Sequence, residues 1–352
     1  MRFDLVRQVI EASLADRAFP AAVVEVGTAT DVLWREPFGC LSYDAEAPPT
    51  REDTVFDLAS LTKVIATAPI VMQQVERGAI GLDDLVSQFI RAWRGIDRES
   101  VTIRDLLAHT AGLTGYLPLY RDHSGRAEFE RTIATLPLEY APRTQSIYSD
   151  LGFMLLAFIL EDVGEAPLPA RFDTLIRQMG MVDRLQFHPP RQWRRETAPT
   201  ELDPWRGRLL VGEVHDENTW ALGGASGHAG LFGTSAAVGA YARHLLQVLS
   251  GRTGAFARET LATFVSRRGD VPGSSRALAW DTMLPTSSCG TRMSPRSFGH
   301  TGFTGTSLWI DPEREMYVVL LTNRVHPTRD NERIKEVRPA VHDAVVEEFD
   351  TM

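Results

Sequence analysis

Ser60 and Lys63 are the two residues in this sequence whose types and spacing most clearly suggest chemistry. Three residues apart on a helix, they would project from the same face. A serine hydroxyl is too weakly acidic to attack a carbonyl carbon unaided, but a lysine held neutral by desolvation or nearby cations can accept its proton. The positive end of the helix and the Ser60 backbone N–H would stabilise the oxyanion that forms. The alternative is an N-cap serine beside a solvated lysine, because the Ser-x-x-Lys pattern is common.

Other segments of the sequence favour the interpretation of Ser60 as a nucleophile over that of an N-cap. Residues 53–63 (DTVFDLASLTK) are followed by 106–113 (LLAHTAGL), then by 148–150 (YSD) and 300–302 (HTG). This order resembles the serine β-lactamase and penicillin-binding protein superfamily over about residues 20–325. The likeness is closest to the class C branch, which includes family VIII carboxylesterases and D-amino-peptidases. Short segments such as VHDEN and GHAGLF also resemble muramyl-peptide amidase-like proteins of that branch.

The resemblance implies a role for each catalytic position. Ser60 would be the acylated nucleophile and Lys63 its proton acceptor or relay. Tyr148 would be the shared general base and the acid that protonates the leaving group. The alternative for Tyr148 is a buried tyrosine of the core.

Substrate-binding roles follow from the same resemblance. His300, Thr301 and Gly302 would form the strand edge along which the acyl chain lies, and the Phe303 N–H would join the Ser60 N–H at the oxyanion. His300 stands where most members have lysine, which removes an obligatory cation for a substrate carboxylate. Histidine can still be charged below its pKa or donate a hydrogen bond near neutrality, so we expect binding of anionic substrates to be weakened.

Asp150 is a second departure from the family pattern, because most members have asparagine there. A carboxylate next to Lys63 favours the protonated, non-basic form of the lysine. Taken together, Asp150 and His300 lead us to expect faster turnover of short-chain esters than of penicillins.

These residues must be positioned by the secondary structure around them. The sequence pattern predicts strands near both ends of the chain and helices in its middle. Pro69 is expected to kink the helix that carries Lys63, and Gly78 to end it. The expected helices are a first one on Leu5, Val9, Ile10 and Leu14, then 61–77, 102–108, 128–135, 151–163, 170–179, 236–249 and 340–349; the expected strands are 21–26, 32–34, 307–310 and 316–321, the last two forming a hairpin.

The resemblance implies an α/β (α+β) fold of the β-lactamase/transpeptidase type. An antiparallel sheet flanked by helices is built from both chain ends, and an all-helical domain is inserted between them. We expect residues 1–78 and 205–352 to form the discontinuous α/β domain and residues 79–204 the helical domain, with the active site in the cleft between the two.

Composition excludes several other classes of function. The 352 residues include 37 Lys plus Arg and 46 Asp plus Glu, a net charge of −9, which argues against nucleic-acid binding. The longest strongly apolar run is 152–160, too short for the ~20 residues of a membrane-spanning helix. Asp4, Arg7 and Glu11 interrupt any signal-peptide core, so we expect a cytoplasmic protein. Two cysteines, Cys40 and Cys289, allow at most one disulfide.

The remaining motifs do not indicate a cofactor or metal. The Gly-rich segment 223–233 has no preceding strand or following acidic ribose contact, so it reads as a cleft-lining loop and not as a dinucleotide fingerprint. His215, Asp216 and His228 lack a spacing that compels a metal site. His109 is expected to satisfy backbone groups in its loop.

The sequence therefore predicts a serine hydrolase that forms an acyl-enzyme on Ser60. The expected substrates are small acyl or peptidoglycan-derived esters or amides. A β-lactamase or D,D-peptidase is the alternative within this chemistry, with a β-lactam among the possible small-molecule partners. A non-hydrolytic penicillin-binding or scaffold protein is the alternative of another class. The sequence does not indicate an oligomeric state.

Overall fold

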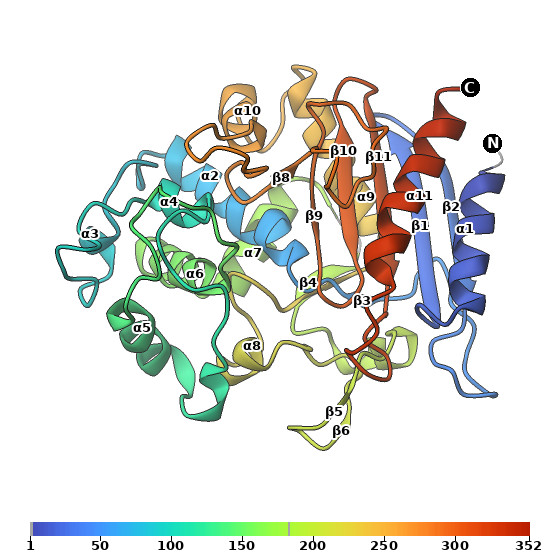
Figure 1. The fold of residues 1–352 in the computed structure, drawn as a ribbon, viewed down its shortest axis with the longest axis horizontal. Coiled ribbons are helices and arrows are strands. Elements are labelled where there is room, and N and C mark those ends of the chain that lie inside the picture. Colours follow the sequence, from blue (N-terminus) through green and yellow to red (C-terminus); the bar gives the residue numbers. More distant parts are fainter. Residues whose placement is uncertain (1–2, 182–183) are drawn as a thin grey trace.

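A six-stranded antiparallel sheet brings the two ends of the chain together (Figure 1). The computed structural model describes residues 3–181 and 184–352; residues 1–2 and 182–183 of the expected domain ranges lie outside the described part. Strand β1 pairs with β11, so that Val23 lies opposite Leu321. The strand order is β2-β1-β11-β10-β9-β8. The strands are β1 (Ala21–Thr28), β2 (Val32–Gly39), β8 (Asp281–Thr282), β9 (Phe298–Thr301), β10 (Ser307–Asp311) and β11 (Met316–Thr322).

Helices cover both faces of this sheet. Helices α1 (Asp4–Ala15) and α11 (Ile334–Phe349) pack side by side on one face, and α9 (Ser235–Leu249) packs on the other (Figure 1). Successive residues of a strand point to opposite faces. Accordingly Val24 belongs to the core under α1 and α11, and Val23 to the core shared with α9.

The rest of the chain is mainly helical and extends away from the large sheet (Figure 1). Helix α6 is apolar almost all round, and its residues from Leu151 to Leu160 are buried, which is typical of a central helix. The other helices are α2 (Ala68–Glu76), α3 (Val86–Phe89), α4 (Ile103–Leu107), α5 (Gly125–Thr135), α6 (Asp150–Gly164), α7 (Leu168–Gln178), α8 (Glu217–Ala221) and α10 (Arg258–Val265).

Two small sheets lie outside the large one. One has the order β3-β7-β4 and the other pairs β5 with β6. The range 79–204 is therefore not helical throughout, because it contributes β4 and β5. Its division from the α/β part stays a prediction. These strands are β3 (Phe56–Asp57), β4 (Leu185–Phe187), β5 (Leu202–Asp203), β6 (Arg208–Leu209) and β7 (Leu231–Gly233).

Most predicted elements are confirmed, including the β10–β11 hairpin. The helix expected over 61–77 is present up to Glu76, but residues Lys63–Thr67 within it form a π-helical turn before α2 begins. Pro69 has no N–H to donate to the Ile65 carbonyl, and the Ala68 N–H donates to the Lys63 carbonyl five residues back. The last helix starts earlier than expected, at Ile334.

Two expectations from composition have structural counterparts. Both cysteines are in the described part of the chain and both thiols are free, with Cys40 exposed and Cys289 buried. Among the described residues, no helix combines the length and apolar character needed to cross a bilayer.

Candidate active site

Ser60 follows a strained turn at the end of β3. Ala59, just before it, has a positive φ of 47°, a backbone conformation that costs free energy in a residue with a side chain. The Asp57 carboxylate stabilises this turn by accepting a hydrogen bond from the Ala59 N–H at 2.9 Å. The turn presents Ser60 partly exposed at the start of the helical segment that carries Lys63.

Lys63 has no exposed surface, which excludes the alternative of a solvated lysine. Its Nζ donates to the Ser60 hydroxyl at 3.0 Å, to the Asp150 carboxylate at 2.6 Å and to the His228 carbonyl at 3.2 Å. Burial is the largest single influence on the pKa of Lys63 and lowers it, but Asp150 and Tyr148 together outweigh burial, so that the pKa lies above its ordinary value. The resting site therefore holds a protonated lysine, as predicted from Asp150.

Tyr148 lies beside this lysine at the entrance to α6. The Lys63 Nζ is 4.8 Å from the centre of the Tyr148 ring, which is half-buried and thus not part of the closed core. Burial raises the pKa of the Tyr148 phenol, the Lys63 charge opposes this rise and Asp150 adds to it. Ser149 caps α6 by accepting from the Gly152 N–H at 3.4 Å, which fixes the backbone between Tyr148 and Asp150.

The end of β9 adjoins the turn before Ser60. A Cβ added to Gly302 would lie 2.5 Å from the Leu58 carbonyl oxygen, so only glycine fits there. The Thr306 hydroxyl donates to that same carbonyl at 3.0 Å. Among the described residues, neither the Ser60 N–H nor the Phe303 N–H has an acceptor. Both N–H groups are therefore free to donate to an oxyanion, and their joint role stays a prediction.

His300 lies in the site but does not supply a cation. Its Nδ1 donates to the Thr301 carbonyl at 2.8 Å, and its buried Nε2 has no partner among the described residues. Burial holds the pKa of His300 well below its ordinary value, and the charges of Lys63 and Arg276 lower it further. His300 is therefore neutral near pH 7, and the weakened binding of anionic substrates at this position stays a prediction.

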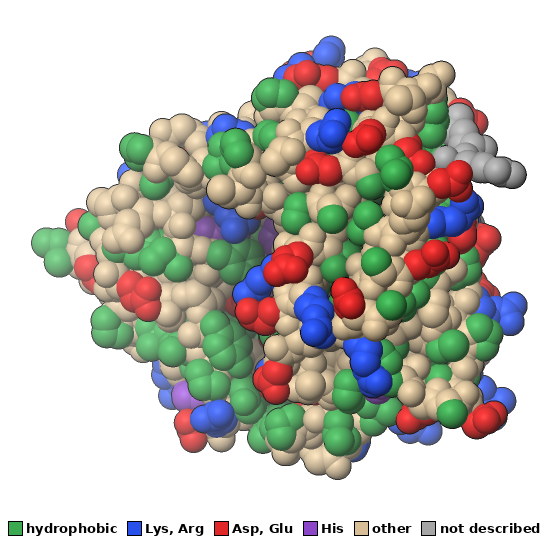
Figure 2. Space-filling model, turned by 45° about the vertical axis from the view of Figure 1, so that its right-hand side comes forward, with side chains coloured by type: hydrophobic (Ala, Val, Ile, Leu, Met, Phe, Trp, Pro, Cys, Tyr) green, Lys and Arg blue, Asp and Glu red, His purple; other side chains and the backbone are tan. Residues whose placement is uncertain are grey.

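Arg276 supplies a positive charge that sequence reasoning missed. Its guanidinium carbon is 5.2 Å from the centre of the Tyr148 ring, and within the described part of the chain it forms no ion pair. Figure 2 shows basic and histidine side chains gathered in a hollow on this face. Arg276 lies in the irregular segment between α10 and β8, which contains no recognisable motif. The one hint in the sequence was the histidine at position 300 in place of the usual lysine, which indicates that another residue could supply the cation.

Comparison with known proteins decides the family. A family model described as Beta-lactamase matches residues 6–342. The chain belongs to the Beta-lactamase family. Two Salmonella relatives, provisionally named D-alanyl-D-alanine carboxypeptidases, are 33% (Salmonella gallinarum) and 32% (Salmonella typhi) identical over 325 residues. Each alignment covers 80% of this chain and 72% of the relative.

Solved structures show the same fold for this Beta-lactamase family member. EstCE1, a hydrolase with promiscuous acyltransferase activity, has a TM-score of 0.77 at 21% identity, with 97% of both chains covered. A class C β-lactamase from Rhodobacter sphaeroides has a TM-score of 0.76 at 17% identity, covering 98% of this chain and 99% of that one. The predicted β-lactamase/transpeptidase-like fold and the predicted serine hydrolase class are thus confirmed.

Other histidines of this Beta-lactamase family member have structural partners. The His109 Nδ1 accepts from the Ser149 N–H at 3.0 Å, as predicted for a residue that satisfies backbone groups. His228 pairs with Asp216 at 2.9 Å, and its carbonyl accepts a hydrogen bond from Lys63, so the Gly-rich segment lies against the side chain of Lys63. His215 pairs elsewhere, with Glu201 at 2.9 Å. No group of three or more possible ligands in the described residues could hold a metal ion.

Proposed function

We propose that this protein hydrolyses small amides and esters through an acyl-enzyme on Ser60 and prefers substrates whose leaving group carries a carboxylate. Peptidoglycan-derived peptides that end in D-Ala-D-Ala belong to this class. The observation that carries the proposal is the Arg276 guanidinium 5.2 Å from the ring of Tyr148, the residue expected to protonate the leaving group. A cation there can hold a carboxylate close to the bond that breaks.

The mechanism begins with attack of the Ser60 oxygen on the substrate carbonyl carbon. The resulting oxyanion accepts hydrogen bonds from the Ser60 and Phe303 N–H groups. Because Lys63 is protonated at rest, one proton must first leave the Lys63–Tyr148 pair before the Ser60 proton can be accepted. Tyr148 then gives a proton to the leaving nitrogen or oxygen as its bond to the carbonyl carbon breaks. Water then attacks the acyl carbon and gives a proton to the Lys63–Tyr148 pair. The pair returns this proton to the Ser60 oxygen as the ester bond breaks and the acid is released.

The curated relatives support this choice of substrate, since both bear the provisional name of a D-alanyl-D-alanine carboxypeptidase. The neutral state of His300 also supports this choice of substrate, because His300 then cannot bind the carboxylate by charge. Lys63 is already paired with Asp150, so Arg276 is the unpaired positive charge beside the Tyr148 ring in the described residues.

The nucleophile is tested by intact-mass spectrometry after treatment with a fluorophosphonate. Wild type should gain one adduct, and Ser60→Ala should gain none. Ser100→Ala is the matched control, because Ser100 is exposed and remote in sequence from the motifs; it should label like wild type. An adduct on Ser60→Ala would refute the assignment.

The substrate is tested with one acylated peptide ending in D-Ala-D-Ala and the same peptide amidated at its C-terminus. We expect the free carboxylate to raise kcat/KM about tenfold or more. Equal rates for the two peptides would contradict a carboxylate preference. A lasting penicillin adduct without turnover of any ester or peptide would favour the non-hydrolytic penicillin-binding alternative.

A further inference from the structure

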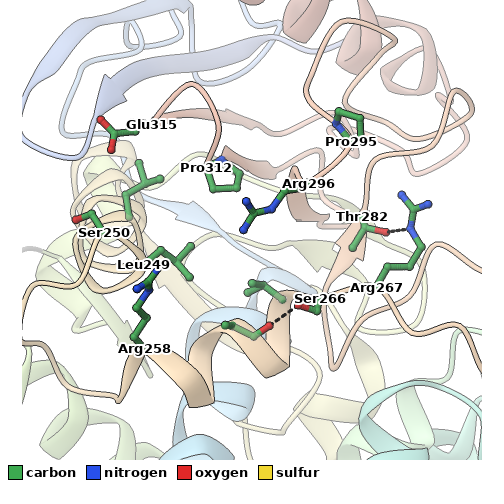
Figure 3. A pocket seen from close by; sticks show the side chains of 13 residues that line it. Leu249, Ser250, Arg258, Ser266, Arg267, Thr282, Pro295, Arg296, Pro312 and Glu315 are labelled. Atoms are coloured by element: carbon green, nitrogen blue, oxygen red, sulfur yellow. Dashed lines mark hydrogen bonds between the residues drawn. The ribbon is translucent and has the colours of Figure 1, made fainter.

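A cavity separate from the Ser60 site lies between α9, α10 and the turn of the β10–β11 hairpin (Figure 3). Its volume is about 490 Å³, which falls within the ~300–1,000 Å³ of small-ligand pockets. None of its lining residues belongs to the Ser60 site. The lining residues are Leu246, Leu249, Ser250, Arg258, Ala262, Val265, Ser266, Arg267, Thr282, Pro295, Arg296, Pro312 and Glu315.

The inner wall of this cavity is apolar. Leu246 and Leu249 come from the last turns of α9, Ala262 and Val265 from α10, and Pro312 from the hairpin turn. Leu246 is buried, and the other four are partly exposed to the cavity and the solvent. When a hydrocarbon group covers apolar side chains that are exposed to water in this way, the free energy of binding becomes more favourable by about 25 cal/mol per Å² of apolar surface buried.

The lining of the cavity is also positively charged. Three arginines line it, Arg258, Arg267 and Arg296, against one acid, Glu315. The excess of basic residues here is opposite in sign to the charge of the whole chain, in which 46 acidic residues exceed 37 basic ones. Figure 3 shows Arg296 extending into the middle of the cavity, whereas the Glu315 carboxylate points away from it. The cavity therefore combines local positive charge with an apolar wall.

Two of these arginines are unpaired and the third is held in place. Within the described residues, neither Arg258 nor Arg296 forms an ion pair. The Arg267 Nε donates to the Thr282 hydroxyl at 2.8 Å, and its Nη2 donates to the Met283 carbonyl. A guanidinium fixed in this way has already lost much of its side-chain freedom before any anion binds.

We propose that this cavity binds a small anionic amphiphile, with a single carboxylate or phosphate head at the arginines and a short hydrocarbon tail against the apolar wall. Arginine donates paired hydrogen bonds that match the oxygens of both head groups. A neutral ligand would leave the guanidinium groups unmatched, and a cation would be repelled. The proposal stands on this cavity alone and is independent of the chemistry at Ser60.

Isothermal titration calorimetry with octanoate and octyl phosphate tests the proposal. We expect at least one of them to bind with a dissociation constant of about 1 mM or lower, and 1-octanol to bind at least about tenfold more weakly. The double variant Arg258→Ala, Arg296→Ala should weaken the binding of the anion about tenfold or more. Both side chains are exposed, so this variant should fold. The two head groups show whether a carboxylate or a phosphate is preferred.

Two control variants locate the binding. Arg131→Ala removes an exposed, unpaired arginine of α5, outside the cavity, and should leave the affinity within about twofold of wild type. Arg276→Ala should do the same, because Arg276 does not line this cavity. A carboxylate bound in the catalytic cleft would instead lose affinity in that variant. Absence of binding by both anions, equal affinity for 1-octanol, or binding that depends on Arg276 and not on Arg258 and Arg296 would each overturn the proposal.

Discussion

The Asp150 carboxylate accepts a hydrogen bond from the Lys63 ammonium at 2.6 Å, and this contact joins the nucleophile-bearing helical segment to the first turn of α6. A carboxylate at that position is favoured by the positive end of the α6 dipole. It also neutralises the lysine charge beside Ser60, so the resting site has a buried ion pair instead of a free base. In the proposed mechanism, the proton held by Lys63, Asp150 and Tyr148 therefore controls when Ser60 can react.

Replacing Tyr148 by phenylalanine removes only the phenolic hydroxyl. We expect kcat/KM to fall about 100-fold or more for a neutral ester, because a positioned acid–base group is lost. The ring itself remains, so Arg276 keeps its aromatic neighbour. Steady-state kinetics on both proteins measures the effect.

Tyr43→Phe is the control for this change. The Tyr43 hydroxyl donates to the Arg17 carbonyl at 3.0 Å, away from the site, and its loss should leave kcat/KM within about twofold of wild type. Near wild-type kinetics for Tyr148→Phe would show that the phenol takes no part in proton transfer.

Replacing Arg276 by alanine tests its assignment as the carboxylate anchor. We expect KM for the D-Ala-D-Ala peptide to rise about tenfold or more, since a charge-assisted hydrogen bond is worth about 1.5–3 kcal/mol. The kcat/KM for the amidated peptide should change less than about threefold. Arg276→Lys should recover part of the loss, because the charge is retained without the paired geometry. An equal loss on both peptides would assign Arg276 a structural role.

The contrast between Lys63 and Arg276 shows what sequence reasoning can reach. Ser60 and Lys63 are neighbours on one helical turn, so their contact follows from local geometry. The proximity of Asp150 follows from the family resemblance at Tyr148. Arg276 belongs to an irregular segment, and its approach to Tyr148 depends on tertiary hydrogen bonds such as that from the Arg268 N–H to the Arg276 carbonyl at 2.8 Å. No residue pattern encodes such a contact.

The π-helical turn that begins at Lys63 shows the same limit within one element. Apolar spacing from Leu61 to Arg77 favours a continuous α-helix. The altered hydrogen-bond register is accompanied by long-range contacts, because the Tyr241 hydroxyl donates to the Val64 carbonyl at 2.7 Å and the Thr67 hydroxyl donates to the Gly227 carbonyl at 2.7 Å. Pro69 indicated that the helix would be distorted near this position, but the sequence could not show that the distortion would be a π-helical turn.

Glu25 offers a test of stability that is separate from the catalytic site. Its carboxylate has no exposed surface, and it accepts hydrogen bonds from the Tyr317 hydroxyl at 2.7 Å, Arg35 at 2.7 Å and Arg243 at 3.2 Å. Glu25→Ala leaves two guanidinium groups without their buried partner. We expect the free energy of unfolding to fall by about 3–5 kcal/mol, as measured by urea denaturation.

Glu52→Ala is the matched control, because Glu52 lies 3.6 Å from the same Arg35 but its side chain is 58% exposed. That loss should cost about 0–1 kcal/mol. A comparable loss of stability in the two variants would contradict the claim that burial of Glu25 makes its ion pairs important.

Asp150→Asn tests how the ion pair sets the pH dependence of catalysis. Burial lowers the pKa of Lys63, whereas Asp150 and, to a smaller extent, Tyr148 raise it, and together they prevail in the wild type. Asparagine has no charge, so only Tyr148 then opposes burial and the pKa of Lys63 falls. The pKa of Tyr148 falls too, because Asp150 contributes to raising it. The essential base therefore appears at lower pH, and the acidic limb of the kcat/KM profile should move toward lower pH.

The profile is measured with a neutral ester that does not itself titrate, so that the acidic limb reports the free enzyme. Asp162→Asn serves as the control, because Asp162 lies near the other end of α6 with its side chain 54% exposed; its profile should coincide with wild type. If the limb of Asp150→Asn stayed in place or moved to higher pH, the proton removed on activation could not be the one that Asp150 holds on the Lys63–Tyr148 pair. The carboxylate would then contribute to the site only through the start of α6.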